Sequence, residues 1–232
     1  MGQLMSWMTG FGLAAGSGGK AFIPLLVLGA FHYTPYFELS DRFVWIASPA
    51  VMVTLGVMAL AEILVDSVPE LGGYADEVAY LPKIAAGFLG FAAATGTVDE
   101  NLAKLALSGV LGGGTAAVVH WIRSGYRRPF REIAENAHSG FAKLASLGEA
   151  GASTVFSAGA IVLPPITLLF GLLAALVALV GIRFFRPKKR GCPHCGFLLD
   201  PEAIVCPSCR RDIPGAQFAR EKDASGRRSA GD

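Results

Sequence analysis

The four cysteines of the chain are its most specific chemical signal. They form two Cys-x-x-Cys pairs, Cys192 with Cys195 and Cys206 with Cys209, and ten residues separate the pairs. Two thiolate pairs at this spacing complete a tetrahedral zinc site, and a short loop between them closes a zinc ribbon. With four cysteine ligands no coordination position stays open, so we expect the Zn²⁺ ion to be structural. Disulfide pairing is the alternative, and it requires an oxidising compartment.

A second set of candidates consists of charged side chains in or beside apolar segments. A charge at membrane depth costs about 2.5–3.5 kcal/mol or more, so each one needs a function or a partner. Lys20 either lines a cavity and meets an anionic group or extends its amine to the membrane interface. Glu62 and Asp66 share one helix face and are suited to a proton, a metal cation or Lys20. The candidate pathway residues are Lys20, Glu62, Asp66, Asp76 and Glu149.

No residue pattern typical of an enzyme occurs. The chain contains no HExxH motif, no Rossmann glycine fingerprint and no Ser/His/Asp arrangement. His120, which precedes Trp121, is expected to be an interfacial residue rather than a ligand. We therefore expect a protein that is not an enzyme, and an activity on lipids is a distant third hypothesis.

The pathway candidates lie in a charge-poor body. The whole chain is 53% hydrophobic and 16% charged, against about 25% charged residues in ordinary soluble domains. This composition excludes a single soluble globule and a disordered chain. A membrane span needs roughly 20 mostly apolar residues. Five segments meet this requirement, at 4–31, 43–65, 79–98, 102–122 and 153–185.

Glycine and proline interrupt the first and the last of these segments. The interrupting residues are Gly18, Gly19 and Pro24 in the first segment and Gly159, Pro164 and Pro165 in the last. Both breaks read serine, a small residue and glycine, followed by proline five residues after the glycine, which is either an internal repeat or a chance match. Paired broken spans are typical of transporter sites, because broken helices expose backbone groups to a substrate.

Residues 123–152 are polar and begin with arginines at 123, 127, 128 and 131. Apolar residues at three- and four-residue steps predict an amphipathic helix, either on the membrane surface or packed on the bundle. A second basic run occupies 183–190, and positive charge marks the cytoplasmic side. Both runs are cytoplasmic if segment 153–185 doubles back as a hairpin. A single long, kinked helix is the alternative.

Two stretches carry a family resemblance. They are the run from Ala14 to Pro24 and the Glu62-xxx-Asp66-xx-Pro69 pattern followed by Asp76. Residues 5–180 resemble an uncharacterised bacterial membrane family, domain of unknown function 4126, here followed by a zinc ribbon. That family usually carries arginine at the position of Lys20 and a Glu-Asp pair at the position of Glu149-Ala150. The resemblance implies a bacterial inner-membrane protein and no particular activity.

The sequence thus predicts an all-α polytopic membrane bundle of five to six hydrophobic segments plus a small zinc ribbon. Its expected parts are a membrane domain (1–185, with a cytoplasmic linker helix at 123–152), a basic linker (186–191), the ribbon (192–213) and a disordered tail (214–232). The N-terminus and the ribbon are expected in the cytoplasm.

The leading functional hypothesis is a transporter- or channel-like protein for a small solute or ion. The alternative is a membrane scaffold or regulator whose ribbon recruits a protein or nucleic-acid partner. Expected partners are the lipid bilayer, the transported solute or ion, a protein at the ribbon and a second copy of the chain.

Overall fold

The computed structural model describes residues 2–68, 76–96, 102–136, 140–185, 190–199, 203 and 205–213. The chain forms two compact units, Met1–Ile182 and Arg183–Asp232. We call the first unit the membrane body. The second contains the four cysteines. The expected disordered tail at 214–232 lies outside the described residues, as does the linker at 186–189.

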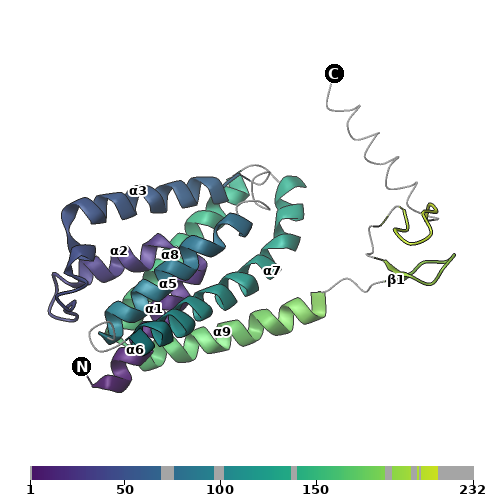
Figure 1. The fold of residues 1–232 in the computed structure, drawn as a ribbon. Helices are drawn as coiled ribbons and strands as arrows, with labels where there is room; N and C mark the ends of the chain where they lie inside the picture. The colour runs from purple at the N-terminus through teal and green to yellow at the C-terminus, as the bar shows by residue number, and fades with distance from the viewer. Residues whose placement is uncertain are drawn as a thin grey trace. The chain divides into compact units, whose positions relative to one another are not determined.

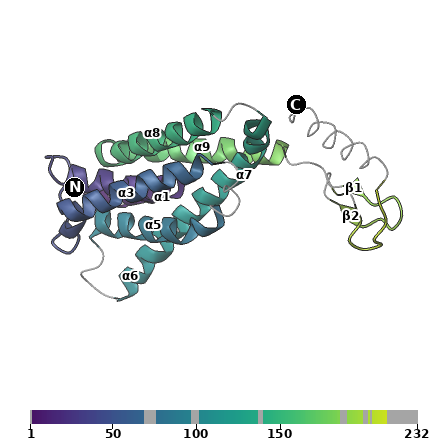
Figure 2. The ribbon, with the colours of Figure 1, turned by 90° about the horizontal axis from the view of Figure 1, so that it is seen from above.

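The described part of the body is helical (Figures 1 and 2). Helix α1 lies inside it and packs against α2, α5, α7 and α8. The helices are α1 (Gln3–Gly19), α2 (Phe22–Phe31), the 3₁₀ helix η1 (Val44–Ala47), α3 (Pro49–Asp66), α5 (Tyr80–Thr95), α6 (Leu102–Ser108), the π-helical turn η4 (Gly109–Gly113), α7 (Gly114–Asn136), α8 (Gly140–Val162) and α9 (Pro164–Phe185).

The first apolar segment is broken, as the sequence predicts. Helix α1 ends at Gly19, Lys20 has an extended backbone, and α2 begins at Phe22. Pro24 falls in the first turn of α2, where a missing N–H removes no helical hydrogen bond. The short stretch between the two helices is called the α1–α2 joint below.

The last apolar segment doubles back, as the hairpin hypothesis predicts. The turn falls between Val162 and Pro164, and proline suits the first position of α9. A Cβ added at Gly159 would lie 2.8 Å from Thr167 Oγ1, and one added at Gly171 would lie 2.8 Å from the ring of Phe156. Residues on either side of the turn therefore face one another.

The prediction of a single linker helix over 123–152 is wrong. Helix α7 continues without interruption from Gly114 to Asn136, and α8 begins at Gly140. The polar stretch is therefore the end of one bundle helix and the start of the next. The pattern of apolar residues continues through both helices, so it does not reveal the boundary between them.

Small residues allow a close approach of α5 and the π-helical turn. A Cβ added at Gly87 would lie 2.5 Å from the Cβ of Ala116 and 2.7 Å from the carbonyl oxygen of Gly112. A Cβ added at Gly112 would in turn lie 2.5 Å from the carbonyl oxygen of Gly87. Small residues at these positions therefore let the two backbones approach closely, as is common between helices in membranes.

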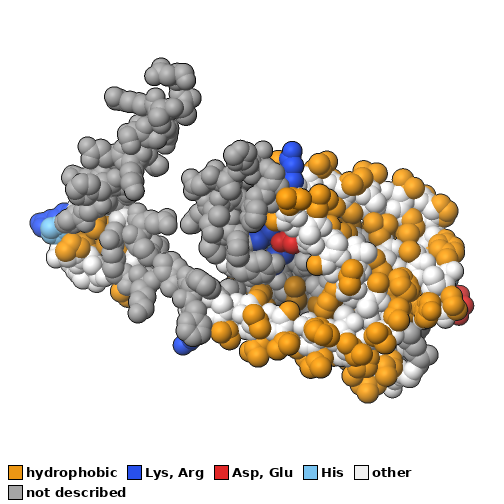
Figure 3. All heavy atoms as spheres, turned by 180° about the vertical axis from the view of Figure 1, so that it is seen from behind, with side chains coloured by type: hydrophobic (Ala, Val, Ile, Leu, Met, Phe, Trp, Pro, Cys, Tyr) orange, Lys and Arg blue, Asp and Glu red, His pale blue; other side chains and the backbone are white. Residues whose placement is uncertain are grey.

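Four described helical stretches are long and apolar enough to cross a membrane: 49–66, 76–95, 103–125 and 164–181. Only 11% of the first and the last of these windows is buried inside the body, so α3 and α9 expose most of their apolar side chains. Hydrophobic side chains cover much of the face of the body seen in Figure 3. Such a surface is stable against lipid and not against water, so the chain is a membrane protein.

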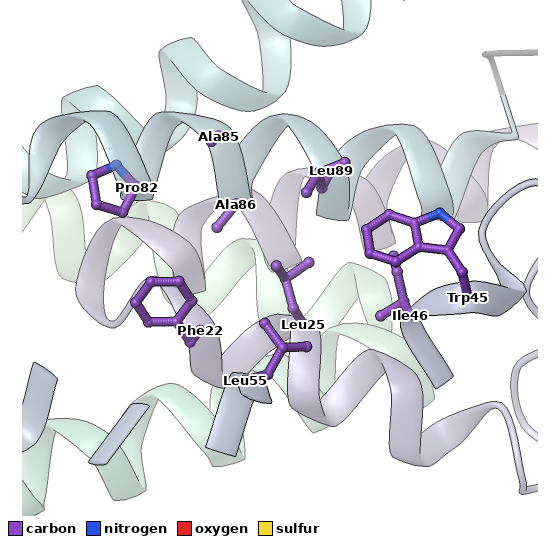
Figure 4. Close-up of a pocket in the computed structure, with 9 residues that line it drawn as sticks. All are labelled: Phe22, Leu25, Trp45, Ile46, Leu55, Pro82, Ala85, Ala86 and Leu89. Atoms are coloured by element: carbon purple, nitrogen blue, oxygen red, sulfur yellow. The ribbon is translucent and has the colours of Figure 1, made fainter. Parts of the chain in front are cut away.

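A pocket of about 170 Å³ lies between α2, η1, α3 and α5 (Figure 4). Its lining is apolar and consists of Phe22, Leu25, Trp45, Ile46, Leu55, Pro82, Ala85, Ala86 and Leu89. No charged side chain lines it, so this pocket is not the polar cavity expected around Lys20 and Glu62.

Candidate functional site

Eight charged side chains gather at the end of the bundle where α1 stops. We call this set the ion network. Its members are Lys20, Glu62, Asp66, Asp76, Lys83, Arg123, Arg127 and Glu149. Four carboxylates meet four cations, so the formal charge of the network is balanced. Charges excluded from water need such pairing, because an isolated one is strongly destabilising.

Asp66 is the centre of the network. Its Oδ2 accepts hydrogen bonds from Lys20 Nζ at 2.6 Å and from Arg123 at 2.5 Å, and Arg127 Nη1 lies 3.4 Å away. Lys20 is fully buried and also donates to the hydroxyl of Ser146 in α8 at 3.2 Å. Lys20 is therefore an ion-paired interior residue, and the alternative of an amine extended to the interface is wrong.

Glu149 joins α8 to the same cations. One carboxylate oxygen accepts two bonds from Arg123, from Nε at 3.1 Å and from Nη2 at 2.6 Å, and the other lies 2.8 Å from Arg127 Nε. Arg123 Nη1 also lies 3.6 Å from Asp76, at the start of the span that contains α5. The guanidinium of Arg123 thus links α3, α7, α8 and the 76–95 span.

The α1–α2 joint is held by charged side chains of the network. The carbonyl oxygen of Gly19 accepts a hydrogen bond from Lys83 Nζ at 3.0 Å. The backbone N–H of Ala21 donates to both carboxylate oxygens of Glu62, at 2.9 and 3.2 Å. Within a membrane every freed backbone group needs a partner, and a negative charge at a helix N-terminus is favourable. Lys83 is the partner of the Gly19 carbonyl. Glu62 is the partner of the Ala21 N–H and also places a negative charge at the N-terminus of α2.

His120 is completely buried, so the prediction that it is an interfacial residue is wrong. Its Nδ1 lies 3.1 Å from Lys83 Nζ, and its Nε2 lies 2.8 Å from the carbonyl oxygen of Asp76. The ring also packs edge-on against Tyr80, with ring centroids 4.4 Å apart. His120 is therefore a partner of the network.

The network occupies the level at which the apolar spans end. Asp66 is the last residue of the span 49–66, Asp76 is the first of 76–95, and Arg123 stands two residues before the end of 103–125. Glu62 lies one helical turn inside that level. The charged layer thus closes one end of the bundle.

All five pathway candidates from the sequence lie in the network: Lys20, Glu62, Asp66, Asp76 and Glu149. Their partners Lys83, Arg123, Arg127 and His120 were not identified as site residues. The sequence pattern indicates that Arg123 and Arg127 are surface charges that mark the cytoplasmic side, whereas in the structure both are buried and ion-paired. The rule that singled out Lys20, a charge within an apolar segment, also applies to Lys83 and would have identified it.

The two predicted helix breaks do not face one another. Ser146, which contacts Lys20 at the first break, lies in α8, and the second break follows Val162 at the other end of that helix. Val162 lies 16 positions after Ser146 in the same helix, a distance of about 24 Å at 1.5 Å per residue. Gly18 and Gly19 therefore adjoin the network, and Gly159, Pro164 and Pro165 belong to a turn far from it.

The second described site is the cysteine cluster. The four sulfur atoms all lie within 4.8 Å of one another, with Cys192 and Cys209 3.8 Å apart and Cys195 and Cys206 3.6 Å apart. A tetrahedron of thiolates with metal–sulfur distances of about 2.3 Å has edges of about 3.8 Å. The cysteines are free rather than disulfide-bonded, so their arrangement fits a metal ion.

The backbone around each cysteine pair repeats the same turn. Gly196 N–H donates to the carbonyl of Cys192 at 2.9 Å, and Arg210 N–H donates to that of Cys206 at 2.8 Å. Both donors have positive φ, +73° and +57°, so Arg210 adopts a conformation that favours glycine. The first turn is flanked by a two-stranded antiparallel sheet of β1 (Arg190–Gly191) and β2 (Leu198–Leu199). Strand β1 begins inside the predicted basic linker.

Backbone donors also prepare the cluster for a metal. The N–H groups of Cys209 and Ser208 lower the pKa of the Cys206 thiol to about 7, whereas the neighbouring sulfurs raise the pKa of Cys209 to about 11, so Cys206 loses its proton before Cys209. A hydrogen bond to the charged form favours deprotonation, and the thiolate is the form that binds metals.

The apolar spans, the buried ion network and the four-cysteine cluster define a multi-helix membrane protein whose C-terminal unit carries four cysteines that could bind a metal ion. A family model described as a domain of unknown function (DUF4126) matches residues 7–186, and the chain belongs to that family. No curated protein and no solved structure matches the chain.

Proposed function

We propose that the protein is a transporter- or channel-like membrane protein for a small solute or ion, with the ion network as the closed end of its pathway. The observation that carries this proposal is the α1–α2 joint. Charged side chains from α3 and α5 hold its two freed backbone groups. Broken helices with charged residues beside the break are typical of transport sites in membranes.

Because their partners are charged, the hydrogen bonds of the α1–α2 joint can be altered. A neutral side chain could complete the hydrogen bonds of Gly19 and Ala21 at lower desolvation cost. The ionic partners make the joint sensitive to any ion or proton that competes for Glu62 or Lys83. That sensitivity is what an alternating gate requires.

A non-transporting scaffold is the second candidate. It is favoured by the balanced charge of the network and by the apolar lining of the pocket between α2, η1, α3 and α5. In this case the network holds the helices together. The segment 190–213 with its four cysteines, called the cysteine module below, recruits a partner.

The metal of the cysteine module is proposed to be Zn²⁺, bound by Cys192, Cys195, Cys206 and Cys209. Four thiolates at tetrahedral spacing select zinc or iron among common metals, and a closed site with no open position is structural. A bacterial inner membrane with the module on the cytoplasmic side is the location that agrees with reduced cysteines.

Flux measurement tests the transport proposal. The full chain is reconstituted in phosphatidylethanolamine–phosphatidylglycerol vesicles, and the uptake of H⁺, Na⁺, K⁺ and Cl⁻ is recorded against empty vesicles. We expect movement of at least one ion and a loss of about 10- to 100-fold in Glu62→Gln, the range of a charge-assisted hydrogen bond. Glu77→Gln, an exposed carboxylate of the 76–95 span, is the matched control. Equal rates in vesicles with and without protein would favour the scaffold.

A further inference from the structure

The hydrogen bonds of His120 fix its protonation state. A carbonyl oxygen only accepts, so Nε2, which lies 2.8 Å from the carbonyl of Asp76, carries the hydrogen. The Nδ1 atom then accepts from the ammonium of Lys83 at 3.1 Å. A proton added to His120 would place two donors, and two positive charges, against each other. Neither His120 nor Lys83 therefore takes up a further proton in this arrangement.

Lys83 is held mainly by two neutral acceptors. Its Nζ donates to Gly19 O at 3.0 Å and lies 3.1 Å from His120 Nδ1, and Glu62 Oε1 is an ion-pair partner at 3.7 Å. The amine is almost completely buried. It therefore stays in place without Glu62, because two neutral acceptors remain.

The carboxylates of the network differ in how tightly cations hold them. Asp66 has Lys20 at 2.6 Å and Arg123 at 2.5 Å, and Glu149 has Arg123 at 2.6 Å and Arg127 at 2.8 Å. Among the described residues, Glu62 has one cation within 4 Å, Lys83 at 3.7 Å, and Lys20 and Arg123 are paired with Asp66 instead. Its other partner is the backbone N–H of Ala21, which remains bonded when the carboxyl is neutral, though more weakly. Among these three carboxylates, Glu62 has the fewest and the most distant ion-pair partners within the described residues.

We propose that Glu62 is a proton-binding site, and that its protonation loosens the α1–α2 joint. The proton adds to a carboxylate oxygen and forms an O–H bond, and Lys83 keeps its own protons. This inference deepens the proposed function, on which it rests for its role, by naming H⁺ as the ion that drives or gates the pathway.

Most elements packed around this site contribute titratable or charged groups, and helix α2 contributes none. Those of the α1–α2 joint, α3, the 76–95 span, α7 and α8 are Lys20, Asp66, Asp76, Tyr80, Lys83, His120, Arg123, Arg127 and Glu149. Asp76 is the competing acceptor, because it lies 3.6 Å from its Arg123 partner. The test must therefore separate Glu62 from Asp76.

Infrared difference spectroscopy locates the proton directly. The full chain in lipid nanodiscs is stepped from neutral to acidic pH, and the C=O stretch of a newly formed carboxylic acid is recorded. We expect one buried band that disappears in Glu62→Gln, persists in Asp76→Asn and persists in Glu77→Gln. Loss of the band in Asp76→Asn instead, or its survival in Glu62→Gln, overturns the proposal.

Amide exchange tests the consequence for the joint. After correction for intrinsic rates, acid should accelerate exchange at Ala21 about fivefold, since a charge-assisted bond becomes a neutral one. Glu62→Gln should show the faster rate at every pH, and Glu77→Gln should behave as wild type. A pH-independent rate at Ala21 in the wild type overturns the loosening.

The flux assay separates this inference from the transport proposal. If the infrared and exchange results hold and no ion moves, the proton site stands and transport fails. If ions move at a rate that neither pH nor Glu62→Gln alters, transport stands and the proton site fails.

Discussion

The membrane body and the cysteine module solve one problem, the stable placement of ionised groups, in opposite ways. The body gathers eight charges from residues 20 to 149 and satisfies them with one another. The module gathers four thiols within residues 192–209 and brings them to the spacing of a metal site. The first arrangement depends on the fold of the whole bundle. The second depends on two short turns that bring the four sulfur atoms within 4.8 Å of one another.

The difference indicates which substitution should destabilise each unit most. A module with so few apolar residues has little core, so we expect the proposed metal to supply most of its folding energy. The body has a large apolar core, so losing one ion pair weakens it and leaves the fold standing.

Removing a metal ligand should have the largest effect. Cys206→Ser should abolish stoichiometric zinc and unfold the module, because apparent binding energies of about 10–16 kcal/mol are lost. Metal content by atomic emission and amide exchange over 190–213 measure both results. Ser208→Ala, an exposed residue of the same turn, should keep the metal. A module that stays folded without metal would contradict the prediction that its folding depends on metal binding.

Breaking the network should have the next largest effect. Arg123→Met leaves Asp66 and Glu149 buried with fewer partners and should lower the free energy of unfolding by about 3–5 kcal/mol. Denaturant titration in detergent micelles measures the loss. Lys143→Met, an exposed residue of α8, should change stability by less than about 0.5 kcal/mol. Equal stability of the two variants would mean that the network does not hold the body together.

Packing of small residues should have a smaller effect. Gly87→Ala places a methyl group against Ala116 and Gly112 and should cost about 1–3 kcal/mol. Gly114→Ala points into open space within a helix and should raise stability by up to about 1 kcal/mol. The same denaturant titration compares them. If both substitutions stabilise, the close approach of α5 to the π-helical turn is not needed.

The sequence predicts features that depend on near neighbours. The cysteine pairs, the break after Gly19 and the turn before Pro164 each follow from a few adjacent residues, and the structure has all three. The membrane spans follow from composition within windows of about 20 residues. The charges Lys20 and Glu62 stand out because their immediate surroundings are apolar.

The partners of these charges could not be predicted in the same way. Lys20 and Asp66 are 46 positions apart, and Asp66 and Arg123 are 57 positions apart. A positive charge after an apolar segment is equally consistent with a surface loop and with a helix that continues past the span. Helix α7 takes the second course, which turns Arg123 and Arg127 from topology markers into parts of the network. Whether α7 continues past the span, rather than ending in a surface loop, depends on the positions of α3 and α8.

The sequence separation within the network also sets the order in which the protein can be made. Lys20 leaves the ribosome 46 residues before Asp66, and at about 5–20 residues per second this is a delay of roughly 2–9 s. Through that interval the amine has no carboxylate to join and cannot settle in lipid alone. We therefore expect α1 to stay beside a hydrated insertion site until the acidic end of α3 has been synthesised.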